Sequence, residues 1–533
     1  QAAVERATGL VDAAQELGYA PLTVKALNAA GLAHARAGNY ARGLRTLREA
    51  YVVSDGAAAS DVAENHHRTG RILVRQGKID DAGFEYDKAA AMYARLGTPT
   101  TSLSVDLANL RIERGEYDEA LRDLEALRLG IVAQRGEDDP DLAGVLLAVG
   151  RVHQAKHQTA PAREAIDGAL ALVSVHYGPD HPRIAALLMT QASVALEQGH
   201  AREAMGLLDR AETVLTDALG PDHPRLTRLL YVRGNAQLEA GQDAEALVNF
   251  REAARRYRVL FGDVHPDVAN ADNAVGRVLM HMGRFDEALV ALRRAGEAFA
   301  ASGERPHPDQ WMVQANAATA HLALGHRESA LAAMKRAMAS ATEAFGPEFY
   351  ALGQMRRQIA QLLLLDHRCA EGLTELKTAR TELRATLGES DTSLAYVADN
   401  LGVAHYLLGD FVAAEAEHRR ALSLYGPNVG PTHFNALTTR GMVATALAGQ
   451  GRHDAAASIV AELQELALAG TIPAEDRAFV DAAALIVEAR GEPLPPTART
   501  ALKSAQQALD AAGVVEWSLV AQAVLQPGFC RPP

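Results

Sequence analysis

The sequence has few of the features that mark secreted, metal-binding or membrane-spanning proteins. Only two of its 533 residues are cysteines, Cys369 and Cys530, which is too few for a disulfide framework or a cysteine-rich metal cluster. So little cysteine fits a reducing compartment, and we expect the protein to be cytoplasmic. No apolar run approaches the roughly 18 residues of a membrane-spanning helix, and no signal peptide opens the chain.

Motifs of the common enzyme classes are also missing. The sequence has no glycine-rich phosphate loop ending in Lys-Ser or Lys-Thr, no His-Glu-x-x-His and no Gly-x-Ser-x-Gly. Its carboxylates are numerous, but solvation explains such residues on helical faces. We therefore expect no catalytic residue, no cofactor and no enzymatic activity in this chain.

The overall charge limits the class of partner. Asp and Glu number 66 against 53 Lys and Arg, so the formal net charge is −13. This balance disfavours nucleic acids and acidic membrane surfaces as partners. Hydrophobic residues make up 48% of the chain but aromatic residues only 5%, which suits closely packed helices with small residues at their contacts.

A repeat of 42 residues organises the chain. The copy that shows it best runs from Gly220 to Phe261, with Gly241 as its anchor. A glycine or a substitute recurs at this spacing, and two slightly shorter copies precede the series. The anchors stand at positions 38, 77, 115, 157, 199, 241, 283, 325, 367, 409 and 451. A fixed period of this length indicates a solenoid that grows by stacking.

Each copy predicts two helices joined by a short turn at the anchor. In the best copy the first helix spans residues 224–239 and the second spans 243–260. Seven residues before every anchor stands Gly or Ala, and nine residues after it stands a large side chain in most copies. Glycine inside a helix costs about 1 kcal/mol relative to alanine. Close approach of the second helix is the natural compensation, and His418, which breaks the large-residue series, is expected to weaken its repeat.

Loops of the Gly-Pro-Asp-His-Pro type join the repeats and place histidines at the repeat period. These histidines are His181, His223, His265 and His307, with His433 further on. They cannot share one zinc ion, because packed helices lie roughly 8–10 Å apart and zinc needs ligands at about 2.0–2.1 Å. We expect them to act in the loop beside a helix N-terminus. The pairs His66–His67 and His153–His157 lack a third ligand, so we expect no metal site.

The repeat positions resemble the tetratricopeptide repeat. In the best copy the matching residues are Gly234, Gly241, Ala246, Phe250 and Ala253. The period of 42 and the loops at 178–182 and 220–224 are similar to the kinesin-light-chain subtype. The resemblance covers nearly the whole chain. It implies an all-α, right-handed α-solenoid (superhelix) of about eleven helix-turn-helix repeats plus terminal capping helices.

Three parts are expected along the chain. Residues 1–21 form the second helix of a truncated leading repeat, and residues 22–490 form the repeat array. Residues 491–533 form C-terminal capping helices, in which Trp517 covers the last exposed face, and end in a loose tail from Gln526. Because the chain begins inside an apparent helix, we expect it to be a fragment of a longer protein.

A narrower resemblance concerns the N-terminal part. Residues 16–22, followed by 38–40 and 47–50, are similar to the repeat region after the kinase domain of large bacterial serine/threonine kinases, notably myxobacterial ones. It implies a regulatory or sensory role beside a kinase domain. The catalytic residues of such a kinase would lie outside this chain.

In tetratricopeptide proteins the first helices line a concave groove, at positions thirteen, ten, six and three residues before the anchor. These positions share one helical face, and in this sequence most of them are polar. Two explanations are open. The wall of the groove is wet, or it binds a peptide whose backbone is held by asparagine and whose carboxylates are held by arginine.

The predicted groove residues concentrate in two adjacent repeats, which form a basic, amide-rich patch in an acidic protein. The full predicted set is Arg71, Asn109, Arg151, Arg228, Tyr231, Asn235, Asn270, Asn273 and Arg277. An extended, acidic segment is the ligand that we expect there. Further along, Leu364, Tyr396, Tyr406 and Met442 predict a more apolar stretch of groove.

Three functions are compatible with the sequence. The first is a non-catalytic scaffold that binds a peptide or partner protein in its groove. The second is the regulatory region of a larger bacterial protein kinase or another signalling effector. The third is a structural solenoid that associates with itself into a homo-oligomer, because solenoid ends and alanine-rich faces can pair.

Overall fold

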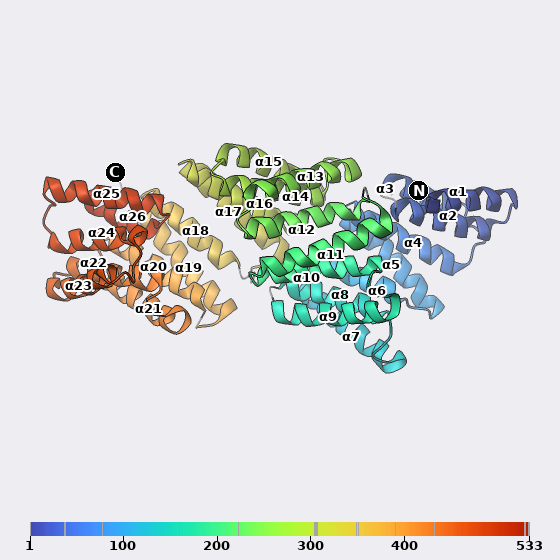
Figure 1. Cartoon of the computed structure of the whole chain (residues 1–533), viewed down its shortest axis with the longest axis horizontal. Coiled ribbons are helices and arrows are strands. Elements are labelled where there is room, and N and C mark those ends of the chain that lie inside the picture. Colours follow the sequence, from blue (N-terminus) through green and yellow to red (C-terminus); the bar gives the residue numbers. More distant parts are fainter. Residues whose placement is uncertain are drawn as a thin grey trace. The chain divides into compact units, whose positions relative to one another are not determined.

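A computed structural model describes residues 2–36, 39–76, 78–156, 158–221, 223–302, 307–347, 349, 351–389, 391–430, 432–526 and 529–530. These residues form 26 α-helices and one short 3-10 helix, and they contain no β-strand (Figure 1). The predicted all-α fold is therefore confirmed. The anchors at 38, 77 and 157, and with the last of these His157, lie outside the described residues.

The helices follow one another as pairs, each with a first and a second helix. The first helices are α2 (Ala20–Arg36), α4 (Ala59–Arg75), α6 (Thr101–Glu113), α8 (Leu142–Ala155), α10 (Pro182–Glu197), α12 (Arg225–Glu239), α14 (Pro266–His281), α16 (Gln310–Ala323), α18 (Ala351–Leu365), α20 (Thr392–Leu407), α22 (Phe434–Gly449) and α24 (Ala478–Glu488). The second helices are α3 (Tyr40–Val52), α5 (Ile79–Leu96), α7 (Tyr117–Arg135), α9 (Thr159–Tyr177), α11 (Ala201–Leu219), α13 (Asp243–Phe261), α15 (Phe285–Ala301), α17 (Arg327–Phe345), α19 (Cys369–Leu387), α21 (Phe411–Val429), α23 (His453–Leu468) and α25 (Pro496–Ala511). Helix α1 (Ala2–Glu16) precedes these pairs, and α26 (Val515–Leu525) follows them.

The chain divides into two compact units, Gln1–Ala320 and His321–Pro533. In the N-terminal unit the first helices α4, α6, α8, α10, α12 and α14 pack side by side in chain order. In the C-terminal unit α18, α20, α22 and α24 do the same. The first helices of each unit thus form one continuous surface, which we call its inner face.

The small residue before each anchor lets the two helices of a pair approach closely. A Cβ atom added to Gly234 would lie only 2.8 Å from the ring of Phe250. The same conflict arises for Gly31 against Leu47, Gly70 against Tyr86, Gly150 against Ile166 and Gly276 against Leu292. Each large residue is the one that stands nine positions after the anchor. The predicted reason for the small residue, close approach of the second helix, is confirmed.

The turn at the anchor uses left-handed backbone. Gly241 has φ +71°, and His367, the substitute at its anchor position, has φ +62°. Left-handed conformation costs a residue with a side chain roughly 1–2 kcal/mol, whereas glycine adopts it freely. The recurring glycine of the sequence is therefore explained by the turn between the helices of each pair.

His418 takes the same place in its repeat as the other large residues. Its side chain is buried, and a Cβ atom on Gly402 would meet its ring at 2.5 Å. Its Nδ1 lies 2.6 Å from Oδ1 of Asp399, and Thr439 donates to the other carboxylate oxygen at 2.9 Å. Its Nε2 atom is buried without a hydrogen-bond partner among the described residues, and the weaker repeat stays a prediction.

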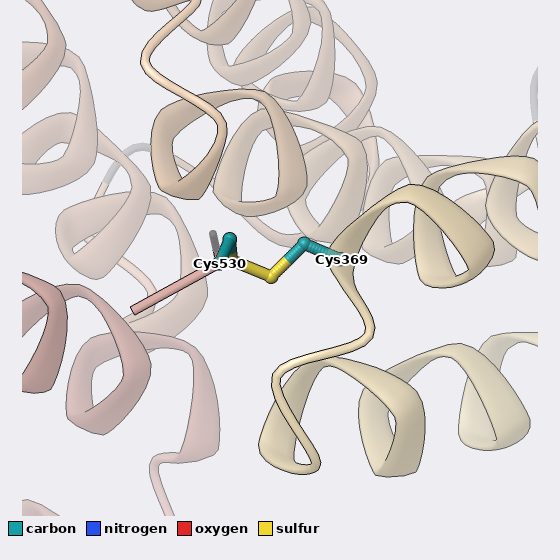
Figure 2. The surroundings of a disulfide bond; sticks show 2 residues. All are labelled: Cys369 and Cys530. Atoms are coloured by element: carbon teal, nitrogen blue, oxygen red, sulfur yellow. A yellow bond between two sulfur atoms is a disulfide. The ribbon is translucent and has the colours of Figure 1, made fainter. Parts of the chain in front are cut away.

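The structure pairs the two cysteines in a disulfide (Figure 2). Cys369 is the first residue of α19, and its Cα atom lies 5.6 Å from that of Cys530. The neighbouring Phe529 is buried. These two tail residues are therefore held against the C-terminal unit, unlike the loose tail expected from Gln526. Because 161 residues separate the cysteines in sequence, only the folded chain reveals the pair.

Helix α26 differs from the expected cap. Trp517 was expected to cover the last exposed face of the array, but its ring packs on Gly441 of α22 and Phe479 of α24. The helix also packs on α18 and α20. It therefore lies on the inner face of the C-terminal unit, where the sequence had placed an apolar stretch of groove.

None of the described helices combines the length and apolarity that crossing a membrane requires.

The close approach of Gly234 and Phe250 predicts opposite effects for two glycine substitutions. We expect Gly234→Ala to lower the free energy of unfolding by about 1–3 kcal/mol, because overpacking outweighs the better helix propensity. Gly206→Ala lies mid-helix in α11 with open space around it, so it is expected to raise stability by about 0.5–1 kcal/mol. Urea denaturation of both variants measures the difference, and equal stabilisation by both would contradict the packing role.

Candidate functional site

The recurring histidines lie beside helix N-termini, and His181, His265 and His433 are the N-cap residues of α10, α14 and α22. In each, Nδ1 accepts a hydrogen bond from the backbone N–H two residues on, so the neutral ring carries its proton on Nε2. The donors are Arg183 for His181 at 3.2 Å, Arg225 for His223 at 3.2 Å, Asp267 for His265 at 3.0 Å, Asp309 for His307 at 3.2 Å and Asn435 for His433 at 3.3 Å. The predicted role beside a helix N-terminus is confirmed.

One of these histidines joins two distant repeats of the N-terminal unit. His265 is buried, and its Nε2 donates to the carbonyl oxygen of Arg75 at 2.6 Å, across 190 residues of sequence. Phe261 stacks on the His265 ring at 3.9 Å, and Tyr40 lies 5.3 Å from Phe261. We call these contacts the His265 clasp. They bring the end of α4 to the start of α14.

The inner face of the N-terminal unit is therefore concave, and it brings arginine side chains of separate repeats near one another. Arg75 on α4 and Arg228 on α12 both act on Arg151 of α8. Burial is the main cause that lowers the pKa of Arg151, and the charges of Arg228 and Arg75 lower it further against the opposing effect of Glu113. Arg75, Arg151 and Arg228, which stand on the first helices α4, α8 and α12, thus lie near one another.

The first part of the predicted groove is internally paired. Arg151 donates to Oδ1 of Asn109 at 2.9 Å and to Glu113 at 3.3 Å. Arg71 contacts the Asp106 carboxylate at 3.2 Å, and His67 contacts the same carboxylate at 2.8 Å. A ligand would have to displace these carboxylates to use Arg71 or Arg151.

Two of the predicted asparagines connect neighbouring repeats. Asn270 donates to Asp309 at 3.3 Å, and Asn273 accepts from Asn316 of α16 at 2.9 Å. Asn273 is buried, so its amide holds the helices together. Neither asparagine presents a fully free amide to a peptide backbone.

The remaining predicted residues are open to a ligand. Within the described part of the chain, the side chains of Arg228 and Arg277 form no hydrogen bond or ion pair, and the same is true of Arg75. Arg228 and Arg75 are exposed, and Arg277 is half-buried. The sequence interpretation missed Arg75, because it stands two residues before its anchor, outside the expected lining positions. Only the curvature of the inner face brings it to the others.

Tyr231 and Asn235 stand on the same helix as Arg228, and Tyr231 lies near Arg277. The Tyr231 ring meets Phe250 edge-on at a centroid distance of 5.5 Å, and its hydroxyl lies near the Asn235 amide. Burial raises the pKa of Tyr231, with Asp309 and Asp267 adding to the rise and Arg277 opposing it. The phenol is therefore neutral at pH 7 and can donate a hydrogen bond. We call Arg75, Arg228, Tyr231, Asn235 and Arg277 the central patch.

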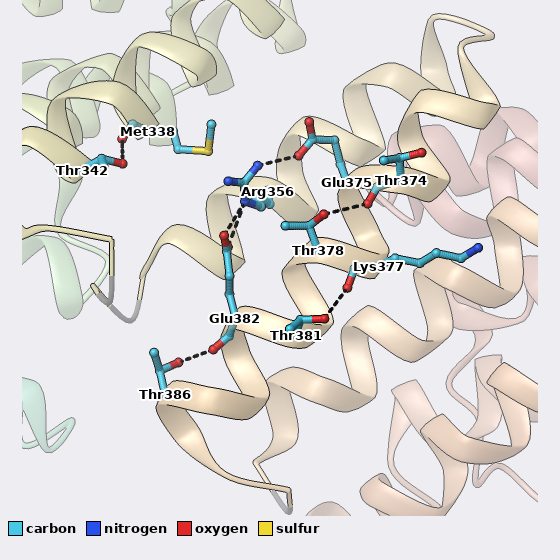
Figure 3. A network of polar contacts seen from close by, with 10 residues as sticks. All are labelled: Met338, Thr342, Arg356, Thr374, Glu375, Lys377, Thr378, Thr381, Glu382 and Thr386. Carbon is cyan, nitrogen blue, oxygen red and sulfur yellow. Dashed lines mark hydrogen bonds and ion pairs between the residues drawn. The ribbon is translucent and has the colours of Figure 1, made fainter.

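A comparison within the chain shows how an arginine between helices is normally satisfied. Arg356 of α18 donates from Nε to Glu382 at 2.8 Å and from another nitrogen to Glu375 at 2.9 Å, both on α19 (Figure 3). Burial alone would lower the pKa of Arg356, but these two carboxylates raise it. The arginines of the central patch have no such carboxylates.

The described residues contain no cluster of three or more His, Cys, Asp or Glu side chains that could hold a metal ion. The central patch itself presents three cations, a phenol and an amide, which are groups that bind anions and peptide backbones.

Two family models of the tetratricopeptide repeat match the chain, one over residues 267–343 and the other over residues 234–267 and 394–435. The chain therefore contains tetratricopeptide repeats, as the sequence predicted. No curated protein matches it.

Several solved structures are similar to parts of the fold. A Podosopora anserina protein described as a kinesin light chain with nearly identical TPR-like repeats is 22% identical, with 38% of this chain and 96% of that chain covered and a TM-score of 0.32. The human IFIT1 dimer with PPP-AAAA is 14% identical, with 75% and 90% covered and a TM-score of 0.40. BtubC (BKLC) from P. vanneervenii is 15% identical, with 43% and 90% covered and a TM-score of 0.33.

The His265 clasp predicts a pH-dependent loss of stability. Burial is the main cause that lowers the pKa of His265 from its ordinary value of 6.5. Its contribution is therefore complete above about pH 6.5, where both folded and unfolded histidine are neutral, and is lost as the pH falls from there toward the lowered native pKa. We expect His265→Asn, which keeps a capping side chain, to reduce this loss by up to about 1.4 kcal/mol per pH unit.

Urea denaturation at pH 7.0 and 5.0 measures the effect. His433→Asn is the matched control, because His433 caps α22 in the same way but is exposed and joins no distant repeat. An unchanged pH dependence in His265→Asn would contradict the clasp.

Proposed function

We propose that this protein is a non-catalytic interaction scaffold whose central patch binds an extended, acidic segment of a partner protein. Proteins with tetratricopeptide repeats typically mediate protein–protein interactions, and the chain contains such repeats. The observation that carries the proposal is that Arg75 and Arg228 lie near one another and Arg277 lies near Tyr231, and among the described residues none of these arginines has a carboxylate partner, in a protein with net charge −13.

The chemistry of the patch favours carboxylates on an extended backbone. An arginine guanidinium binds a carboxylate through two parallel hydrogen bonds. In an extended peptide the side chains alternate between two faces, so acidic residues at every second position all point to one side. Asn235 and the neutral Tyr231 hydroxyl supply hydrogen bonds for the peptide groups between them.

A peptide suits this patch better than a long polyanion. The arginines of the central patch stand on three first helices, α4, α12 and α14, whereas the protein as a whole is strongly acidic. A short acidic segment contacts the patch alone. A nucleic acid would extend beyond it over surroundings that repel phosphate.

Attachment to a kinase and self-association receive no comparable support. The family models that match are both tetratricopeptide repeats, and the resemblance to kinase-associated repeats rests on residues 16–50. A cytoplasmic location stays part of the proposal. It does not follow from the low cysteine content alone, because Cys369 and Cys530 are joined in a disulfide.

The proposal predicts that a peptide of alternating glutamate and serine, sixteen residues long and fluorescently labelled, binds the chain and that its lysine–serine counterpart does not. We expect Arg228→Gln with Arg277→Gln to weaken binding of the acidic peptide at least about tenfold, because each charge-assisted hydrogen bond contributes about 1.5–3 kcal/mol. Fluorescence anisotropy at 150 mM salt measures both affinities.

The matched control is Arg122→Gln with Arg293→Gln. It makes the same change of formal charge at two exposed arginines on the second helices α7 and α15. This variant is expected to bind the acidic peptide as the original chain does. If both double variants weaken binding equally, the effect is due to net charge alone. If neither variant weakens binding, the central patch is not the binding site.

A further inference from the structure

The inner face of the C-terminal unit is covered by the last helix of the same chain. Helix α26 packs on α18, α20 and α24, all of which are first helices (Figure 1). Among the described residues, the second helix on which it packs extensively is its neighbour α25. Leu519 and Val520 of α26 are buried in one hydrophobic cluster with Leu364 and Met442, which the sequence had assigned to an apolar stretch of groove.

Glu516 of α26 is held by two amides of this face. Gln361 donates to its Oε1 at 2.7 Å, and Asn400 donates to the same oxygen at 2.9 Å. Gln361 stands six residues before its anchor, at a position expected to line the groove, and Asn400 is buried. Two donors from two different repeats thus converge on one carboxylate oxygen, in the way that a groove would hold an acidic side chain of a ligand.

Trp517 occupies an apolar site next to this carboxylate. Its indole is fully buried, and its Nε1 donates to the carbonyl oxygen of Thr438 at 3.3 Å. A Cβ atom on Gly441 would lie 2.6 Å from the indole ring, so the glycine leaves room on α22 for Trp517. Phe479 of α24 borders the indole at a centroid distance of 6.0 Å.

The segment after α26 is attached at a second point. The ring of Phe529 meets His367 edge-on at 4.1 Å, at the turn between α18 and α19. The disulfide joins Cys530 to Cys369 beside this turn (Figure 2). Helix α26 is therefore fixed from both sides, by its short connection to α25 and by the disulfide.

We propose that the inner face of the C-terminal unit is a binding site for a helix that carries an acidic residue next to a tryptophan. Helix α26 is its internal occupant. The Cys369–Cys530 disulfide is a redox latch that retains α26 on this face. With the disulfide intact, α26 excludes a partner helix. Reduction frees the far end of α26, and a partner protein with a helix of the same character then competes for the face.

The chemistry of the latch is thiol–disulfide exchange with a cellular dithiol. One thiolate of the dithiol attacks Sγ of Cys530, which is half-buried, while Cys369 is buried and leaves as a thiolate. Cys369 opens α19, and a helix N-terminus stabilises a thiolate. The second thiol of the reductant then resolves the mixed disulfide. Two electrons and two protons convert the protein disulfide to two thiols, and the dithiol is oxidised to a disulfide.

Reduction changes how strongly α26 is retained without detaching it. The helix remains joined to α25 through residues 512–514, so its effective concentration at the inner face stays high. Loss of the second attachment permits it to open, and a partner can bind during that opening. A disulfide in a reducing compartment is commonly transient and redox-sensing, which agrees with a latch.

Hydrogen exchange of the full chain, oxidised and after treatment with dithiothreitol, tests the latch. Amides of residues 515–525 are expected to exchange at least tenfold faster in the reduced chain, with α20 and α25 changing less than twofold. In Cys530→Ser, dithiothreitol should change nothing. If hydrogen exchange accelerates equally from α18 to α26, the disulfide stabilises the whole C-terminal unit and is no specific latch on α26. If exchange at α26 does not accelerate, the disulfide does not retain this helix. Either result overturns the proposal.

Binding of a labelled peptide that comprises residues 513–526 tests the face itself. We expect it to bind the reduced full chain at least tenfold more tightly than the oxidised chain. Substitutions in the peptide that correspond to Glu516→Gln and Trp517→Ala should each abolish this gain, and a peptide of scrambled sequence should not bind. Equal affinity for oxidised and reduced chain, or undiminished binding of the substituted peptides, would overturn the proposal.

Discussion

The rest of the structure depends on one contact within the repeat. A large side chain of the second helix packs on a glycine or alanine of the first helix, where a larger residue would not fit. Phe250 against Gly234 shows it most plainly, since a single added carbon atom would lie 2.8 Å from the ring. This contact sets the distance between the two helices of a pair. Because the second helix occupies that side of the first, the first helices are left to pack on one another and form the inner face.

Curvature brings residues of separate repeats together on this face. The His265 clasp brings Arg75 to the region of Arg151 and Arg228, although these residues belong to three separate repeats. Arg356, which lies between two paired helices, is bound by two glutamates, whereas the arginines of the central patch form no such contact with the described residues. In the C-terminal unit the corresponding surface already holds a helix, and its contacts show what such a face can recognise. An acidic residue is bound there by Gln361 and Asn400.

Much of the fold could be predicted from residues that recur at fixed spacings in the sequence. The period, the paired helices, the small residue before each anchor and the capping histidines all follow from residues a few positions apart, and each is found in the structure. The location of Arg75, the disulfide and the position of α26 depend on contacts across 79 or more residues, or on the curvature that such contacts produce. No periodic pattern encodes those contacts. For the same reason Asn270 and Asn273 looked like ligand-binding residues, but their amides join adjacent repeats.

The central claim is that the arginines left without partners on the concave face of the N-terminal unit are the binding site. A crystal structure of the chain with the glutamate–serine peptide tests it most directly. The account predicts an extended peptide along the first helices, with carboxylates bound by Arg75, Arg228 and Arg277. A peptide bound on the second helices, or bound elsewhere with these three arginines still unpaired, would contradict it.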